Sequence, residues 1–307
     1  MTGHILAFMM LLGNVFQVLA STALALPLLL ALTLAAGRRG HGRLCLWGGT
    51  RLARLCLAVA VAGCVYYWFY YSLVFGIEPG PPEALAIPMK RNLMLAVACW
   101  AAGLAFLFLG YRKTAAFSAP SAALPPEEDR YDLARVLPAL LPGLAACLCF
   151  TAAFFSMEGV FGTPPQGMDQ ATYLATLLRK TLRGAFGDLS LAGGAGAVLL
   201  CLLRDRPEVA DPARFATAAR WCALWGAVGF LPGCIDQWSN LLLSGVWLPG
   251  PAPGVTAVLR SPLFFRSLFL LFWLAAFCRP ALVRSPGFCL IPWLLTLLVA
   301  PLTGVMM

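Results

Sequence analysis

The most regular feature of this sequence is the recurrence of long apolar stretches separated by shorter polar ones. An apolar run of about 20 residues is long enough to cross the roughly 30 Å hydrocarbon core of a bilayer as a helix. The pattern therefore predicts an all-α, polytopic transmembrane helical bundle of about eight spans. The predicted spans are residues 4–36, 52–76, 92–111, 134–157, 184–203, 221–247, 261–278 and 287–305.

The composition agrees with this pattern. Of the 307 residues, 61% are hydrophobic and 11% are charged, whereas a soluble domain has about 45–50% apolar and about 25% charged residues. We expect a single transmembrane domain over residues 1–307, with helix groups at 1–111 and 134–307 joined by a polar loop at 112–133. The first apolar run is longer than the hydrophobic core of a signal peptide and has no basic residues before it, so we interpret it as a retained helix.

The net charge is +9. In a membrane protein, Lys and Arg concentrate in cytoplasmic connections, so membrane topology explains this charge without nucleic-acid binding. The connection after the first span is the most basic one. It contains Arg38, Arg39, Arg43, Arg51 and Arg54. We therefore expect this connection to be cytoplasmic, both termini to lie outside, and the chain to be a multi-pass protein of the inner (cytoplasmic) membrane whose partner is the lipid bilayer and not nucleic acid.

Some cations fall on the outer side of this arrangement. They are Lys90, Arg91, Arg179, Lys180, Arg183, Arg260 and Arg266. Three of them directly precede the fifth span, in a stretch that predicts a helix lying along the membrane surface, with Arg179 and Arg183 on one face. Arg179, Lys180 and Arg183 are candidates to bind an anionic group, such as a haem propionate or a lipid phosphate. Snorkelling of long basic side chains at the interface is the alternative explanation.

Two carboxylates fall within predicted spans, where ionisable side chains are costly and usually face the bundle interior or a wet cavity. Asp236 is expected to be the deeper one, in a segment where Pro232 removes a helix hydrogen bond. Asp188 is expected nearer the outer end of its span, within reach of Arg183. Both are candidate catalytic groups that accept protons. An interhelical hydrogen bond for Asp236 and simple charge balance for Asp188 are the alternatives.

The small residues after Asp188, LAGGAGAV, predict a close contact between helices and not a nucleotide loop, because they lie in the middle of a span. The 11 cysteines lie mostly in apolar runs without metal-site spacing, and we interpret them as small buried residues.

Histidine limits the haem chemistry that the chain can support. The sequence has 2 histidines, of which His41 lies in the basic connection and His4 at the outer mouth of the first span. His4 is therefore the one candidate His within the spans for a metal bond to the iron of a b-type haem. An interfacial His that binds no metal is the alternative.

Aromatic residues gather at the outer end of the second span, in YYWFYYSLVFG, which includes Trp68 and Tyr71. Such rings are typical of a membrane-interface belt. A flat apolar site for a quinone ring, covered by the Pro-rich loop that follows, is the competing interpretation.

Three of these features together resemble a known family. They are a His at the mouth of the first span, a Trp/Tyr cluster followed by FGIEPGPPEALAIPMKRNLM, and TYLATLLRKTLRGAFGDLSLAG before the fifth span. They are similar to the core of the cytochrome bd oxidase subunit I family, and more so to its divergent relatives that pair with c-type cytochromes. The resemblance implies that His4 ligates a haem and that Arg179, Lys180 and Arg183 approach the haem propionates.

The chain also departs from that family. It has no His in the fifth span, no pair of Glu in the third span, and no long Gln-rich loop between the sixth and seventh spans. The resemblance therefore implies a quinol-linked respiratory subunit that holds at most one or two b-type haems and exchanges electrons with a c-type or multihaem cytochrome at the outer face. Whether it oxidises quinol itself stays open. A transporter or channel with its site at the Pro232-kinked sixth helix, and a haem-free membrane anchor, are the alternatives.

Overall fold

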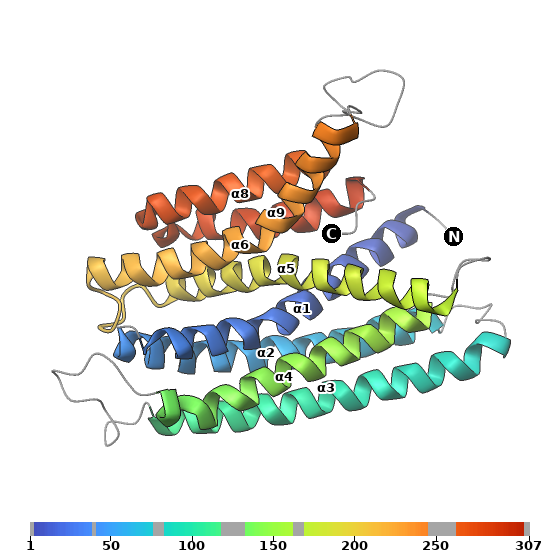
Figure 1. The fold of residues 1–307 in the computed structure, drawn as a ribbon, viewed down its shortest axis with the longest axis horizontal. Helices are drawn as coiled ribbons and strands as arrows, with labels where there is room; N and C mark the ends of the chain where they lie inside the picture. The colour runs from blue at the N-terminus through green and yellow to red at the C-terminus, as the bar shows by residue number, and fades with distance from the viewer. Residues whose placement is uncertain are drawn as a thin grey trace. The chain divides into compact units, whose positions relative to one another are not determined.

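The computed structural model describes residues 3–38, 41–75, 83–117, 133–161, 169–244 and 262–303. The all-α prediction is confirmed, because these residues form helices and contain no strand. The helices are α1 (Gly3–Ala36), α2 (Gly42–Phe75), α3 (Glu83–Phe117), α4 (Leu133–Phe161), α5 (Gln170–Leu202), α6 (Pro212–Ser244), α8 (Pro262–Cys278), the 3₁₀ helix η2 (Pro280–Arg284) and α9 (Pro286–Thr303) (Figure 1). A helix is present at each predicted span.

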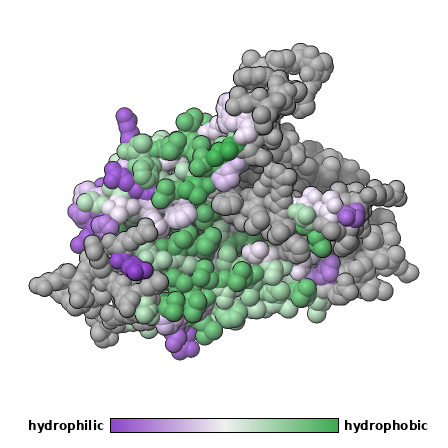
Figure 2. Space-filling view, in the orientation of Figure 1, coloured by the Kyte–Doolittle hydropathy of each residue, from purple (hydrophilic) through white to green (hydrophobic). Residues whose placement is uncertain are grey.

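Several of these helices are long and apolar enough to cross a membrane. Within the described residues, the candidate crossing segments are Val18–Ala36, Gly42–Val65, Met94–Ala116 and Val136–Phe154, and the shorter apolar segments Asp188–Leu202 and Ser267–Cys278 lie in α5 and α8. Figure 2 shows broad hydrophobic areas on the described surface, with hydrophilic residues gathered mainly toward one end. Large apolar areas exposed in this way mark contact with lipid or with other proteins, and the chain is a multi-pass membrane protein.

The chain folds as two compact units. The first unit is Phe16–Leu182, which holds most of α1, then α2, α3, α4 and the beginning of α5. The second unit is Met1–Val15 together with Arg183–Met307, which holds the rest of α5, then α6, α8, η2 and α9. The division falls within α5. Most of the polar loop predicted at 112–133 lies outside the described residues, and α3 continues to Phe117.

The core of the first unit depends on a tryptophan and on small residues that make room for large ones. The Trp100 indole nitrogen on α3 donates a hydrogen bond to the Ala60 carbonyl on α2 at 3.1 Å, and its ring lies 4.7 Å from that of Phe150 on α4. A side chain on Gly103 would meet the Phe150 ring at 2.6 Å. The absence of a Cβ at this position therefore allows α3 and α4 to approach closely.

The core of the second unit follows the same principle with other helices. Gly193 on α5 faces the backbone of Gly226 on α6, since a Cβ on Gly193 would lie 2.6 Å from the Gly226 nitrogen. The Trp273 indole on α8, 2% exposed, fills the space that a side chain on Gly226 would occupy. This geometry confirms the prediction that LAGGAGAV forms a close helix contact.

Four helices, α2, α3, α5 and α6, begin nine or more residues earlier than their predicted spans. α2 begins at Gly42, so Arg43, Arg51 and Arg54 lie on a helix and not in a loop. α5 begins at Gln170 and runs without a break to Leu202, so the predicted surface helix is the first part of one continuous helix. Asp169 caps this helix by accepting a hydrogen bond from the Thr172 backbone nitrogen at 2.9 Å.

Candidate functional site

The alternating direction of the helices places the predicted site residues at one end of their own unit (Figure 1). In the first unit, these residues are Trp68 and Tyr71 near the end of α2, and Arg179 and Lys180 near the beginning of α5. In the second unit, they are His4 near the beginning of α1, Arg183 and Asp188 on α5, and Asp236 on the C-terminal half of α6. The opposite end of each unit carries the connections that the sequence predicts to be cytoplasmic.

Asp188 is the predicted site residue whose side chain the structure describes. It is half-buried and is followed by the buried Leu189 and Ser190. The side chains of His4, Trp68, Tyr71, Arg179, Lys180, Arg183 and Asp236 lie outside the described part of the chain. Their roles in catalysis, haem ligation and quinone binding therefore stay predictions.

The helix register gives the positions of the two carboxylates along α5 and α6. Gly193 and Gly226 are level with each other on antiparallel helices, and Asp188 precedes Gly193 whereas Asp236 follows Gly226. At a rise of about 1.5 Å per residue, Asp188 lies about 7.5 Å and Asp236 about 15 Å along its helix from this contact, in the same direction. The depth of each carboxylate in a membrane is not set by this register, so the expectation that Asp236 is the deeper one stays a prediction. In Figure 1, α6 also turns away from α5 over this part of its length.

α6 is helical on both sides of Pro232 and through it, from Pro212 to Ser244. A translocation site at this position would be expected to use a broken helix whose free backbone groups line a cavity. The continuity of α6 therefore gives no support to the transporter alternative.

A polar contact lies in the core of the second unit, two residues after Asp188 on α5. The Trp273 indole nitrogen donates a hydrogen bond to the Ser190 hydroxyl at 3.1 Å, and both residues are buried. The Trp293 indole nitrogen on α9 would lie 3.4 Å from a Cβ on Gly194, and this nitrogen is buried without a hydrogen-bond partner in the described residues. Sequence reasoning missed both tryptophans, because a Trp in an apolar run gives no sign of which helix it faces.

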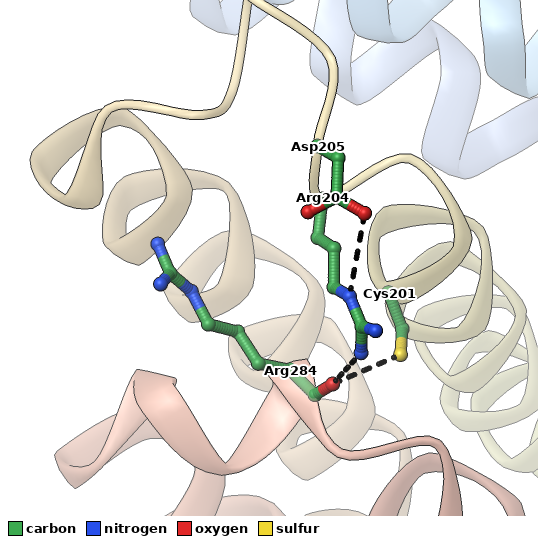
Figure 3. Close-up of polar contacts among 4 residues, drawn as sticks. All are labelled: Cys201, Arg204, Asp205 and Arg284. Atoms are coloured by element: carbon green, nitrogen blue, oxygen red, sulfur yellow. Dashed lines mark hydrogen bonds and ion pairs between the residues drawn. The ribbon is translucent and has the colours of Figure 1, made fainter.

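Hydrogen bonds to one carbonyl connect the helices at the end of the second unit where the sequence predicts cytoplasmic connections (Figure 3). The Arg284 carbonyl in η2 accepts a hydrogen bond from Arg204 Nη1 at 2.7 Å and a weaker one from Cys201 Sγ at 3.4 Å. The Arg204 guanidinium also lies 3.7 Å from the exposed Asp205 carboxylate.

Two further arginines at this end have structural roles. The Arg284 guanidinium lies 4.8 Å from the centre of the Phe215 ring, and Arg220 donates a hydrogen bond to the Phe277 carbonyl at 3.4 Å. Val283 and Val209 are buried nearby. The arginines at this end therefore cap carbonyls and cover apolar side chains, which explains their presence without a bound ligand.

The predicted haem ligand, His4, has its side chain outside the described part of the chain. Within the described part of the chain, no group of three or more His, Cys, Asp or Glu side chains is arranged to hold a metal ion. The His side chain that the structure describes is that of His41, which is exposed and has a left-handed backbone with φ of 58° in the connection between α1 and α2. It therefore cannot serve as an axial ligand inside a span.

Comparison with known proteins identified no relative of the chain. No protein-family model, no curated protein and no solved structure matches the chain. The interpretation of the site therefore depends on its own residues and on the helices that position them.

Proposed function

We propose that the chain is an integral subunit of a respiratory electron-transfer complex in the cytoplasmic membrane. In this proposal it crosses the membrane eight times with both termini outside, quinol docks at the outer end of the bundle, and electrons pass to or from a partner cytochrome at the outer face. The presence of a helix at each predicted span supports the crossing pattern. The positions of the predicted site residues at one end of their own unit support the choice of the outer end.

The observation that carries the proposal is the length and continuity of α5. Its 33 residues span about 50 Å at about 1.5 Å per residue, more than the roughly 30 Å of a hydrocarbon core. The predicted fifth span, residues 184–203, accounts for about 30 Å of that length. The turns that carry Arg179, Lys180 and Arg183 therefore extend beyond the hydrocarbon on the outer side. These cations and the half-buried carboxylate thus belong to one continuous helix.

The arginines at the proposed inner end differ from the cations on α5 in having described partners. Arg204, Arg220 and Arg284 have structural partners, and the positive-inside rule accounts for their side of the membrane. The cations on α5 lie on the side where that rule predicts few. Binding of an anionic or strongly polar group, such as a quinol headgroup or an acidic partner surface, gives a physical reason for their position.

The proposed chemistry uses the chain's own groups for binding and for proton transfer. Oxidation of a quinol to a quinone releases two protons and two electrons. The Asp188 carboxylate accepts a proton from the quinol hydroxyl, and Asp236 serves as the second acceptor. A base in this role must come within about 2.6–3.2 Å of the proton donor. Trp68 and Tyr71 stay the candidate contacts for a quinone ring on the first unit, and the electrons leave to the cytochrome.

A quinol-oxidation assay on the complex purified from membranes tests this proposal. Asp188→Asn and Asp236→Asn preserve shape but remove the base. We expect each to lower turnover about 100-fold, since proton transfer to a positioned group is worth about 10²–10⁴ in rate. The matched control is Asp205→Asn at the inner end, whose exposed carboxylate should leave turnover unchanged.

Assembly of each variant is checked by size-exclusion chromatography. If quinol fails to raise the thermal stability of the parent protein, the proposed quinol site is wrong. Full turnover in both carboxylate variants would instead leave quinol binding in place and remove the two carboxylates from the mechanism.

A further inference from the structure

A second charged feature lies at the inner end of the first unit, between α2 and α3. Arg54 Nε donates a hydrogen bond to the Tyr111 hydroxyl at 3.2 Å, and the guanidinium carbon lies 5.6 Å from the centre of the same ring. This contact fixes the plane of the guanidinium. The two Nη groups of Arg54 form no ion pair with a described residue, and the Tyr111 hydroxyl keeps its own proton to donate.

More cations surround this pair. Arg51 lies one turn before Arg54, with its guanidinium 5.8 Å from the Trp47 ring centre, and Arg112 and Lys113 follow Tyr111 on α3 and are exposed. The sequence contains no Asp or Glu in residues 41–54 or 111–117. The cluster formed by Arg51, Arg54, Tyr111, Arg112 and Lys113, which we call the inner basic cluster, therefore has no carboxylate on its own segments to neutralise it.

The inner basic cluster continues directly into apolar surface. Arg54 shares a helix face with Val61 and Val65, which follow at helical spacing and are 50% and 66% exposed. On α3, Arg112 lies one turn after Phe108, which is 51% exposed. Each strip of exposed apolar side chains thus ends in a cation. This is the arrangement that an acyl chain and its phosphate headgroup would match.

We propose that the inner basic cluster binds the phosphate of an anionic phospholipid, whose acyl chains lie along the exposed apolar faces of α2 and α3. Arg54 presents a planar fork of N–H donors to the phosphate, a geometry suited to bidentate contact. Tyr111 positions that fork and donates its own hydrogen to a phosphate oxygen. Arg51, Arg112 and Lys113 add charge, which favours anionic over zwitterionic headgroups. This site is separate from the proposed quinol chemistry and does not depend on it.

Native mass spectrometry of the purified full chain with added phosphatidylglycerol or phosphatidylcholine tests the site. We expect the parent protein to bind phosphatidylglycerol more tightly, with an affinity that falls as salt is raised. Arg54→Gln should weaken phosphatidylglycerol binding about fivefold, because one basic residue near a lipid headgroup contributes about 1 kcal/mol. Arg112→Gln, on an exposed side chain with no described packing role, should weaken it to a similar extent. Phosphatidylcholine binding should change little in both variants.

Arg214→Gln is the matched control, because Arg214 is an exposed arginine on α6, outside the first unit. It should leave the preference for phosphatidylglycerol intact. Equal affinity of the parent protein for the two lipids, or unchanged binding in both Arg54→Gln and Arg112→Gln, would overturn the proposal. Inorganic phosphate that displaces phosphatidylglycerol at equal concentration would show that the cluster binds free phosphate, and would overturn the lipid assignment.

Discussion

The indole nitrogen of Trp273 on α8 donates a hydrogen bond to the hydroxyl of Ser190 on α5, at 3.1 Å and out of contact with solvent. It is one of the polar contacts between side chains of different helices in the second unit. A donor left unpaired in such an apolar interior keeps its desolvation cost without compensation. This bond therefore favours one position of α8 against α5.

Removal of one partner of the Trp273–Ser190 hydrogen bond should lower the free energy of unfolding more than its removal does when the other partner is already absent. Ser190→Ala leaves the Trp273 N–H unpaired and should lower the free energy of unfolding by about 1–3 kcal/mol. In a Trp273→Phe background, which has no N–H, the same change should cost much less. Unfolding in mixed micelles, analysed as a double-mutant cycle, measures the difference. Equal costs of Ser190→Ala in the two backgrounds would show that the bond contributes nothing to stability.

Gly226 should be intolerant of any side chain. A Cβ at this position would overlap the Trp273 indole, whose ring carbons lie on that site, and the bulky ring cannot move without disturbing the core. We expect Gly226→Ala to destabilise the protein by about 1–3 kcal/mol, as other overpacked cores are destabilised.

The matched control for this change is Gly48→Ala on α2, where the nearest atom to an added Cβ is 4.0 Å away. There the same substitution should be neutral or stabilising by up to about 1 kcal/mol, because alanine is the better helix former. Thermal unfolding of the two variants side by side checks the prediction. Equal melting temperatures would contradict the close packing of α6 against α8.

The beginning of α5 should lose stability in acid. The hydrogen bonds from Thr172 hold the pKa of the Asp169 carboxyl below its usual value of 3.8. Because the folded pKa is depressed, the contribution of the charged cap is present above pH 3.8 and is lost as the pH falls through the lower folded pKa. Asp169→Asn keeps a capping oxygen but cannot titrate. We expect the thermal stability of this variant to show a weaker decline than that of the parent protein below pH 3.8, with parallel profiles at higher pH.

The proposed sidedness predicts which positions an impermeant thiol reagent reaches in intact cells. Thr172→Cys, at an exposed position on the outer part of α5, should be labelled without permeabilisation. Arg206→Cys, at an exposed position in the connection between α5 and α6, should be labelled only after the membrane is opened. The parent chain measures labelling of the native cysteines. The reverse pattern would invert the topology and place the α5 cations in the cytosol.

Haem ligation by His4 predicts a specific optical result. A reduced-minus-oxidised spectrum of the purified protein should show a b-type Soret and α band that is lost in His4→Ala and retained in His41→Ala. His41 is the suitable control because it lies exposed in the connection between α1 and α2. A band that survives in His4→Ala would assign the ligand to another residue. A colourless parent protein would remove haem from the proposal and leave the quinol assay as its test.

The sequence by itself determined where the helices lie. Backbone groups in a hydrocarbon environment must be hydrogen-bonded within the chain, so each long apolar run had to become a helix, and each predicted span coincides with one. The sequence also determined the close contact at LAGGAGAV, because only residues without large side chains allow two backbones to meet. It placed the candidate residues along these helices without showing their side-chain contacts.

Only the tertiary structure decided how the helices group and which side chains meet. A span that is apolar all round has no polar stripe to mark its outward face, so the sequence could not pair Trp100 with Phe150 or Trp273 with Ser190. Those pairings follow from shape: a glycine on one helix leaves the space that an indole or phenyl ring on another helix fills. For the same reason the division within α5 emerged only from helix packing, because it depends on which helices contact each other.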